Sequence, residues 1–270
     1  MCGITSVVLT YNEEINISHC LKSLQWTKRQ IVVDSGSTDK TVEIAHGAEV
    51  VVHSPEEFTF ADQRNWALEN IDISTEWVLF IDADEEIPPS LAEQIVRDVQ
   101  AATDQITAFQ LAPKFIFMDQ WLKHTMNYPA WHDRLIRYGR AKFQGDLWEK
   151  VKTDGKIKKI SEPYLHYGLR KGLKPWMQKH VLYAHQTADM LRNLSKGENF
   201  YASDVIYYLF FGGSISKKKA AELLAAKWPL LGAAGRFLHY YIFRGGILDG
   251  KAGFVYSQLM AVYQFLISLF

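Results

Sequence analysis

The chain has 270 residues, of which 48% are hydrophobic, and this is enough for one large domain or for one domain with an appendage. Its two cysteines, Cys2 and Cys20, provide neither a disulfide framework nor a zinc-binding spacing, which fits a reducing compartment. Basic and acidic residues balance overall, but residues 1–111 carry 19 acidic and 6 basic side chains while the rest carry the opposite excess. This asymmetry indicates two surfaces with different partners.

The N-terminus lacks the basic stretch, apolar segment and cleavage site of a secretory signal, so we expect no signal peptide. Short apolar segments then alternate with helix-like stretches over about a hundred residues. Such alternation argues for βαβ units and a parallel sheet. We expect a helix after the first strand with Asn12 as its N-cap, and another helix near residues 60–70. We expect strands at residues 5–10, 30–33, 49–53 and 78–82.

The strand over residues 78–82 ends in a run of carboxylates, and Pro88-Pro89 prevents it from continuing. Asp82 and Asp84 are two positions apart, so in an extended chain their side chains share a face. Two carboxylates fixed there suit Mg²⁺ or Mn²⁺ carrying phosphate. The alternative is an acidic loop that caps the next helix.

Polar or acidic loops also follow the first two strands. The carboxyl ends of parallel strands lie along one edge of a sheet, where α/β proteins bind ligands. We therefore expect Glu13, Asp34 and the Asp82–Asp84 pair to converge in one crevice.

Four motifs in this order resemble family 2 glycosyltransferases, which have the GT-A fold. They are residues 8–13 (VLTYNE), 33–39 (VDSGSTD), 62–65 (DQRN) and 80–84 (FIDAD). The later segment resembles the bacterial lipopolysaccharide-core β-1,4-glucosyltransferase branch of that family. Its shorter signatures are residues 132–137 (HDRLIR), 145–149 (GDLWE), 166–167 (HY) and 244–250 (RGGILDG).

The resemblance implies a nucleotide-sugar site at the ends of the first strands. It implies that Asp34 contacts uracil, that Asn12 and Glu13 line the nucleoside pocket, and that Arg64 meets the diphosphate. A guanidinium suits phosphate oxygens, although Arg64 could instead be a solvated helix charge. The complete predicted set is Thr10, Tyr11, Asn12, Glu13, Asp34, Ser35, Gly36, Arg64 and Asp82.

The resemblance also implies a metal site and a catalytic base. Asp84 is the implied ligand of Mg²⁺ or Mn²⁺, Asp82 contacts ribose or the metal's water, and His166 is a further ligand or else a core histidine. Inversion in a single displacement needs a carboxylate that takes the acceptor's proton. We assign this role to Glu149, with Asp133 as the alternative. Glu149 could otherwise form an ion pair with a neighbouring lysine.

The C-terminal part is basic and then strongly apolar from Trp228 onward, after an aromatic and basic stretch at residues 198–219. In the last helix, Ser257, Gln264 and Ser268 form a narrow polar stripe. Three interpretations stay open: a short transmembrane helix, a helical hairpin lying in a membrane interface, and an internal helical layer packed on the catalytic domain or a second subunit. We favour the membrane interface, since basic and aromatic residues flank the apolar segment.

We therefore expect an α/β GT-A fold with a helical, membrane-associating C-terminal appendage. Residues 1–110 would bind the nucleotide sugar, residues 111–170 would supply the acceptor contacts and the base, and residues 171–270 would form the helical region. The expected partners are a UDP-sugar, a lipid-linked or lipopolysaccharide-core saccharide, and the cytoplasmic face of the bacterial inner membrane. We expect no nucleic acid, and a homodimer is possible.

The expected reaction is inverting transfer of a hexose, by resemblance glucose, with a divalent metal. One alternative is a catalytically inactive membrane scaffold or glycan-binding protein. A phosphotransferase of the haloacid dehalogenase type also ends a strand in Asp-x-Asp. It usually has Thr or Val two residues beyond the second Asp, where this chain has Glu86.

Overall fold

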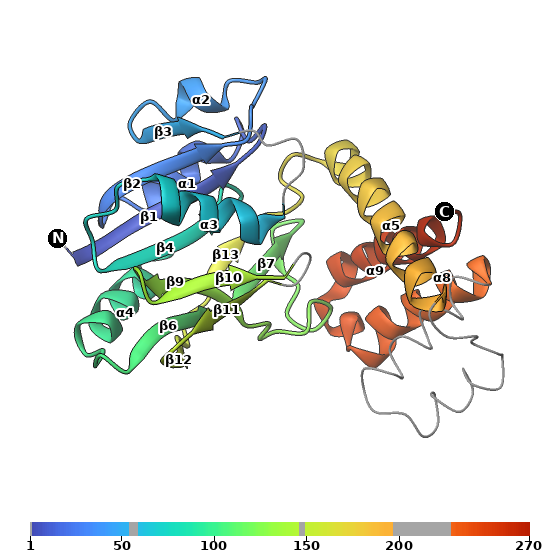
Figure 1. Cartoon of the computed structure of the whole chain (residues 1–270). Coiled ribbons are helices and arrows are strands. Elements are labelled where there is room, and N and C mark those ends of the chain that lie inside the picture. The colour runs from blue at the N-terminus through green and yellow to red at the C-terminus, as the bar shows by residue number, and fades with distance from the viewer. Residues whose placement is uncertain (1, 54–58, 146–148, 197–227) are drawn as a thin grey trace. The chain divides into compact units, whose positions relative to one another are not determined.

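The computed structural model describes residues 2–53, 59–145, 149–196 and 228–270 (Figure 1). The aromatic and basic stretch at 198–219 lies outside these residues, as do residues 146–148 of the motif that ends in Glu149. The chain forms two compact units. Unit 1 comprises Met1–Ile116 and Tyr128–Arg170, and unit 2 comprises Phe117–Asn127 and Lys171–Phe270.

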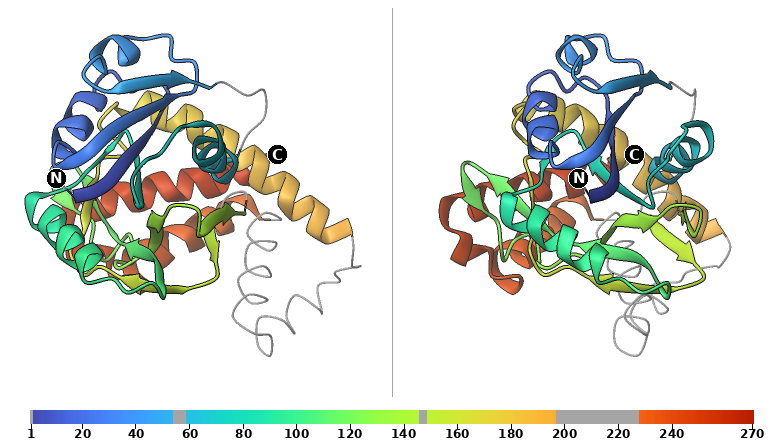
Figure 2. Two further views of the ribbon diagram at one scale, coloured as in Figure 1. Left: turned by 60° about the vertical axis from the view of Figure 1, so that its left-hand side comes forward. Right: turned by 90° about the vertical axis from the view of Figure 1, so that its left-hand side faces the viewer.

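The main sheet of unit 1 is mostly parallel. In the described residues its strand order is β12-β6-β9-β4-β1-β2-β3, and β9 runs antiparallel to both of its neighbours. Strands β1, β2 and β3, drawn in blue, lie side by side in both views of Figure 2. The expectation of an α/β fold with a mostly parallel sheet is confirmed. The strands are β1 (Cys2–Thr10), β2 (Thr27–Asp34), β3 (Glu49–Val52), β4 (Trp77–Asp82), β6 (Ile106–Leu111), β9 (His132–Arg137) and β12 (Lys156–Lys159).

Helices cover both faces of this sheet. Leu21 of α1 and Ile95 of α4 belong to one buried cluster with Val8, whereas Ala67 of α3 belongs to a second cluster with Val7. Neighbouring residues of a strand point to opposite faces, so burial of both Val7 and Val8 requires a central strand covered on both sides. The helices of unit 1 are α1 (Ile17–Ser23), α2 (Thr41–Ile44), α3 (Phe60–Asn70) and α4 (Pro89–Gln100).

The expected N-cap at Asn12 is wrong. The first helix begins at Ile17, with Asn16 in the N-cap position, because the backbone N–H groups of both residues donate to the Glu13 carbonyl and form a turn. Asn12 instead has a positive φ of 52°, a conformation that asparagine tolerates better than most residues. Its side chain accepts a hydrogen bond from the loop after β2, as described below.

Shorter strands complete unit 1. Strands β10 (Ala141–Gln144) and β11 (Lys150–Thr153) form an antiparallel pair. Strand β13 (Tyr164–His166) lies between β5 (Glu85–Glu86), to which it is antiparallel, and β7 (Pro113–Phe117), to which it is parallel. The register pairs His166 with Glu85, so β13 brings a histidine beside the carboxylate run that follows β4.

In its described part, unit 2 contains one short strand and several helical segments. Asp249 connects two of its parts, since its carboxylate accepts the backbone N–H groups of His124 at 3.0 Å and Thr125 at 2.7 Å. Gly246 approaches the same segment so closely that an added Cβ would lie 2.9 Å from the Thr125 hydroxyl oxygen. The 244–250 motif therefore has a structural role here. The elements are β8 (Gln120–Trp121), α5 (Leu173–Lys196), α8 (Pro229–Leu238), η1 (His239–Phe243), η2 (Gly246–Asp249) and α9 (Gly250–Ile267).

Two of the three residues of the predicted polar stripe face inward, and the third, Ser268, follows the end of α9 and is half-buried. Ser257 and Gln264 are 0% and 1% exposed, and the Gln264 carbonyl accepts a hydrogen bond from Arg236 Nε at 3.0 Å. Phe254 and Val262 of the same helix are exposed. Two buried polar side chains and exposed apolar ones on the same helix depart from the usual pattern of a helix at a water-facing surface. In the described ranges, no helix combines the length and apolar character needed to cross a bilayer.

Candidate active site

The carboxyl ends of β1, β2 and β4 lie side by side. Thr10 at the end of β1 is in register with Asp34 at the end of β2, and Leu9 is in register with Asp82 at the end of β4. Three loops, including the one that carries Asp84, therefore leave the sheet at one edge. The expected convergence of these strand ends is confirmed.

Side chains tie the loops after β1 and β2 together. The Asn12 side-chain carbonyl accepts the Thr38 N–H at 2.8 Å, and the Asn12 N–H donates to Ser37 Oγ at 2.8 Å. The Glu13 N–H donates to Thr41 Oγ1 at 2.7 Å. Asn12 and Glu13 are thus held in place by the second loop, which gives the predicted nucleoside pocket a fixed wall.

Asp34 organises its own loop. Its carboxylate is 1% exposed and accepts the N–H groups of Gly36 at 3.0 Å and Ser37 at 2.8 Å. Gly36 has a φ of 86°, in the left-handed region that glycine adopts most readily. These bonds fix the turn that would face a nucleobase, and contact of Asp34 itself with uracil stays a prediction.

The remaining predicted residues of these loops differ in exposure. Tyr11 is 56% exposed, whereas the Thr10 hydroxyl is buried with no hydrogen-bond partner among the described residues. The Ser35 hydroxyl accepts a hydrogen bond from Gln63, which the sequence reasoning did not select.

Asp82 lies between two arginines. Arg64 Nη2 is 3.2 Å from Asp82 Oδ1, and Arg134 Nη2 is 2.9 Å from Asp82 Oδ2. Burial raises the pKa of the Asp82 carboxyl, but Arg134 and Arg64 together hold it well below its usual range. Both carboxylate oxygens therefore already have a cation, and the predicted contacts of Asp82 with metal or ribose would add to these ion pairs.

A buried ion pair supports the loop that carries Asp84. Arg134 Nη2 also lies 2.6 Å from Glu85 Oε1, and Glu85 Oε2 accepts the Asp82 backbone N–H at 3.0 Å. Glu85 is 0% exposed, and burial raises its pKa to about 7 against the opposing charge of Arg134. Arg134 and Glu85 thus fix both the side chain and the backbone of Asp82.

Asp84 and His166 face each other across this edge. Asp84 Oδ2 is 3.5 Å from His166 Nε2, and the Asp84 carbonyl accepts the Tyr167 N–H at 2.9 Å. Burial lowers the pKa of His166, but the Asp84, Glu85 and Asp82 carboxylates raise it above its ordinary value overall. The structure therefore brings together the two metal-ligating residues predicted from separate parts of the sequence.

The donor set fits a divalent ion delivered with phosphate. Among the residues that the structure describes, no group of three or more His, Cys, Asp or Glu side chains is arranged to hold a metal. Asp84 and His166 provide one oxygen and one nitrogen, which Mn²⁺ accepts and Mg²⁺ accepts less readily. Substrate oxygens and water would complete the coordination, as is usual for ions bound with nucleotides.

The two candidate bases have different surroundings. Glu149 forms an ion pair with Arg64, not with Lys150 or Lys152. Asp133 is buried, and its carboxylate accepts hydrogen bonds from Gln110 Nε2 at 3.0 Å and from the Val151 N–H at 2.8 Å. Asp133 therefore connects β9 to β6 and β11, and the role of Glu149 as the catalytic base stays a prediction.

Arg64 itself is held tightly. It is 4% exposed, and its guanidinium carbon lies 5.3 Å from the centre of the Phe143 ring and 5.9 Å from that of Phe80. The next residue, Asn65, makes two hydrogen bonds to the Phe143 backbone, at 2.8 and 2.9 Å. Burial and the neighbouring Arg134 lower the pKa of Arg64 to about 10, so the side chain remains a cation at neutral pH.

Three contributors were missed at the sequence level: Gln63, Glu85 and Arg134. Gln63 and Glu85 stand next to residues that were selected, and adjacency alone gave no reason to include them. Arg134 carried a usable signal, because it is a charged residue that directly precedes the apolar pair Leu135 and Ile136 on a strand. A buried arginine requires a carboxylate partner.

Comparison with known proteins agrees with this geometry. The family model described as glycosyl transferase family 2 matches residues 5–159. The lipopolysaccharide core biosynthesis glycosyltransferase LpsC of Rhizobium meliloti is 28% identical over 159 residues, which cover 55% of this chain and 55% of LpsC. The chain thus matches about half the length of that relative. An uncharacterized glycosyltransferase of Rickettsia typhi is 39% identical over 98% of this chain and 85% of its own length.

Solved structures give a partial match. Glucosyl-3-phosphoglycerate synthase from Mycobacterium tuberculosis, in complex with Mn²⁺, UDP and glucosyl-3-phosphoglycerate, is 26% identical with a TM-score of 0.35. The match covers 42% of this chain and 44% of that one. At this extent the likeness carries no conclusion about the chemistry of this chain.

Proposed function

The chain belongs to glycosyl transferase family 2, and from that premise we propose that it transfers a hexose with inversion from a UDP-sugar to a saccharide acceptor. It is a glycosyltransferase with a GT-A-like α/β fold. We propose glucose as the hexose and a lipopolysaccharide-core or other lipid-linked glycan as the acceptor. The acceptor class is supported by the similarity to LpsC, whose name assigns it to lipopolysaccharide core biosynthesis.

One observation carries the proposal. At a single edge of the sheet, Asp84 Oδ2 lies 3.5 Å from His166 Nε2, beside an Asp82 that is bonded to two arginines. Carboxylate, imidazole and guanidinium groups so arranged suit a metal-bound diphosphate. The tied loops that carry Asn12 and Asp34 flank the same edge and would receive the nucleoside.

In the proposed reaction, Glu149 accepts the proton of the acceptor hydroxyl. The acceptor oxygen then forms a bond to the anomeric carbon as the bond from that carbon to the β-phosphate oxygen breaks, and UDP departs with the electron pair. Arg64 stabilises the charge that develops on the diphosphate.

Asp84 and His166 would hold Mn²⁺ or Mg²⁺. When bound, such an ion supplies Lewis-acid stabilisation of the leaving diphosphate. Both residues are positioned before any ligand arrives, because β13 is hydrogen-bonded to β5 and the Asp84 carbonyl is bonded to Tyr167. The protein therefore does not have to reorganise these donors during the reaction.

A donor-binding measurement tests this function. In the presence of Mn²⁺, UDP-glucose should raise the melting temperature of the full chain, because a ligand that binds only the native state stabilises it. GDP-mannose and CMP-linked sugars serve as controls and should give smaller shifts. Slow metal-dependent release of UDP from the same sugar would separate an enzyme from an inactive scaffold. A chain that responds to no UDP-sugar would contradict the proposed donor class.

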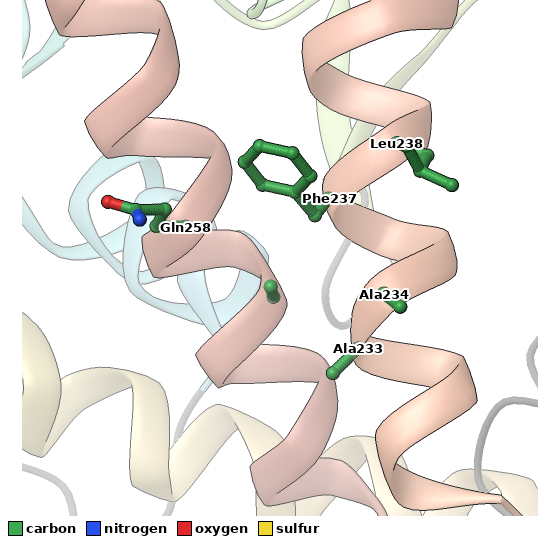
Figure 3. Close-up of a pocket in the computed structure, with 6 residues that line it drawn as sticks. Ala233, Ala234, Phe237, Leu238 and Gln258 are labelled. Atoms are coloured by element: carbon green, nitrogen blue, oxygen red, sulfur yellow. The ribbon is translucent and has the colours of Figure 1, made fainter.

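We also propose that unit 2 binds the cytoplasmic face of the bacterial inner membrane, with the outer surface of its C-terminal helices in the lipid interface. Residues 228–270 contain one acidic residue, Asp249, and three basic ones. Three basic residues against one acidic residue leave this segment with a net positive charge, which complements anionic lipid. A groove between α8 and α9 is lined by Ala233, Ala234, Phe237, Leu238, Gln258 and Ala261 (Figure 3).

The apolar exposure of this segment is large. Phe243 is 80% exposed, Leu230 77% and Leu248 72%, while the polar side chains Ser257 and Gln264 are buried. Exposed apolar surface marks sites that bind a membrane or another protein where such side chains gather. Strongly exposed apolar side chains together with basic residues in the same segment suit a helix pair that lies on a membrane.

Replacement of Phe243 and Leu248 by glutamate should weaken binding to vesicles that contain anionic lipid by about tenfold or more. Burial of each such side chain contributes about 1.5–3 kcal/mol, and the new charges are repelled. Cosedimentation of the full chain with phosphatidylglycerol vesicles measures this, and Ile157→Glu in unit 1 is the matched control. Equal sedimentation of all three proteins would exclude this surface as the membrane contact.

A further inference from the structure

Arg64 is already paired with two carboxylates in the structure. In the structure, Nη2 is bonded to Asp82 at 3.2 Å and Nη1 is paired with Glu149. In the proposed function the same residue also meets the diphosphate of the donor. The side chain is 5% exposed, its helix is anchored through Asn65, and aromatic rings lie beside it, so it has little freedom to serve distant groups in turn.

The Glu149 carboxylate is engaged by Arg64 in this structure. A carboxylate next to a guanidinium is stabilised in its charged form and therefore binds a proton less readily. Its side chain is only 15% exposed, which strengthens the interaction relative to a pair in open solvent. In the donor-free protein, the negative charge of Glu149, the proposed base, is thus compensated by Arg64.

We propose that Glu149 and the donor diphosphate compete for Arg64, and that donor binding releases Glu149 to act as the base. This inference rests on the proposed function and adds a coupling between donor binding and deprotonation of the acceptor. A diphosphate carries more negative charge than a carboxylate and offers several acceptor oxygens, so it is the stronger partner for a guanidinium. The base becomes active only when a donor is present to react.

The surrounding network tolerates such an exchange. Asp82 retains Arg134 at 2.9 Å when Arg64 exchanges Glu149 for a new anion, and Arg134 retains Glu85 at 2.6 Å. The acidic loop therefore stays fixed while one ion pair changes partner. Glu149 comes from a different segment of the chain, directly before β11. It is paired with Arg64 and is not held by the Asp82–Arg134–Glu85 group.

The consequence is unusual for a catalytic carboxylate. Glu149→Gln should bind UDP more tightly than the native chain, by about tenfold, which corresponds to about 1.4 kcal/mol, even though transfer is lost. Glu149→Asp, with a carboxylate one methylene further back, should lie between the two. Uridine lacks the diphosphate, so its affinity should be the same in all three proteins.

Isothermal titration of the full-length proteins with UDP and with uridine, both with Mn²⁺ present, measures these affinities. Glu86→Gln is the matched control, because it removes one carboxylate from β5 without touching Arg64; Glu86 pairs with Arg170 at 2.8 Å. A similar gain in Glu86→Gln would assign the effect to net charge and overturn the proposal.

Unchanged or weaker UDP binding by Glu149→Gln, with normal binding by the native chain, would also overturn the competition while leaving the proposed function intact. Failure of the native chain to bind UDP would contradict the proposed donor class and the competition together. Melting temperatures establish that each variant is folded, and Glu149→Asp supplies the same comparison if the glutamine variant is not.

Discussion

Replacement of Asp84 by alanine is expected to abolish glycosyl transfer, lowering kcat by about a thousandfold or more, while the protein stays folded. Loss of a metal-ligating carboxylate removes several kcal/mol of transition-state stabilisation, and about 4 kcal/mol corresponds to a thousandfold. The fold should survive because the Asp84 side chain is only half-buried, whereas its backbone carbonyl, which holds the Tyr167 N–H, is unaffected by the substitution.

Three measurements separate this effect from a general loss of structure. Initial rates with UDP-glucose give kcat, a manganese titration gives the metal dependence, and thermal unfolding reports the fold. His166→Ala should weaken the metal dependence in the same direction with a smaller loss of rate, since Asp84 remains. Glu93→Ala, at a carboxylate on α4 that is 73% exposed, is the control and should behave as the native chain. An Asp84→Ala protein with native rates would exclude this carboxylate from catalysis.

The loops at this edge of the sheet could be predicted from the sequence because each strand end is recognised from residues that are neighbours in the chain. A short apolar run followed by Asp, Asn or Gly indicates where a strand ends, and parallel strands end at one edge whatever their partners are. Asp34, Asp82 and Asp84 were found in this way. The order of the motifs indicated the family, which the individual strand ends could not indicate.

The ion pairs at that edge depend on contacts between distant segments. Arg64 and Glu149 are far apart in the chain, as are Glu85 and Arg134, and no periodicity relates them. The polar residues of α9 likewise show that a sequence pattern does not determine which face of a helix is buried. The spacing of Ser257 and Gln264 predicted one polar face, but only the packing of Arg236 against Gln264 decides that this face is inside.

Among the residues that sequence reasoning missed, Arg134 is expected to have the largest effect on stability. Arg134→Met should lower the free energy of unfolding by about 3–5 kcal/mol, the usual cost of removing one partner from a buried ion pair. Glu85 loses its cation and Asp82 keeps only Arg64, and Glu85 is 0% exposed, so water cannot replace the lost partner. A domain is stable by only about 5–15 kcal/mol, so this is a large fraction of the total.

Equilibrium unfolding in urea measures the loss, and a second substitution tests its cause. If the cost arises from an unpaired buried carboxylate, Glu85→Gln added to Arg134→Met should recover part of the stability, because a neutral amide needs no counter-charge. Lys142→Met is the control, since Lys142 pairs with Glu69 at 2.8 Å on an exposed surface where such pairs contribute little. If the double variant is less stable than Arg134→Met by the full cost of Glu85→Gln alone, the two residues act independently. In that case Arg134 stabilises the fold through its packing over the Tyr164 ring and not through its charge.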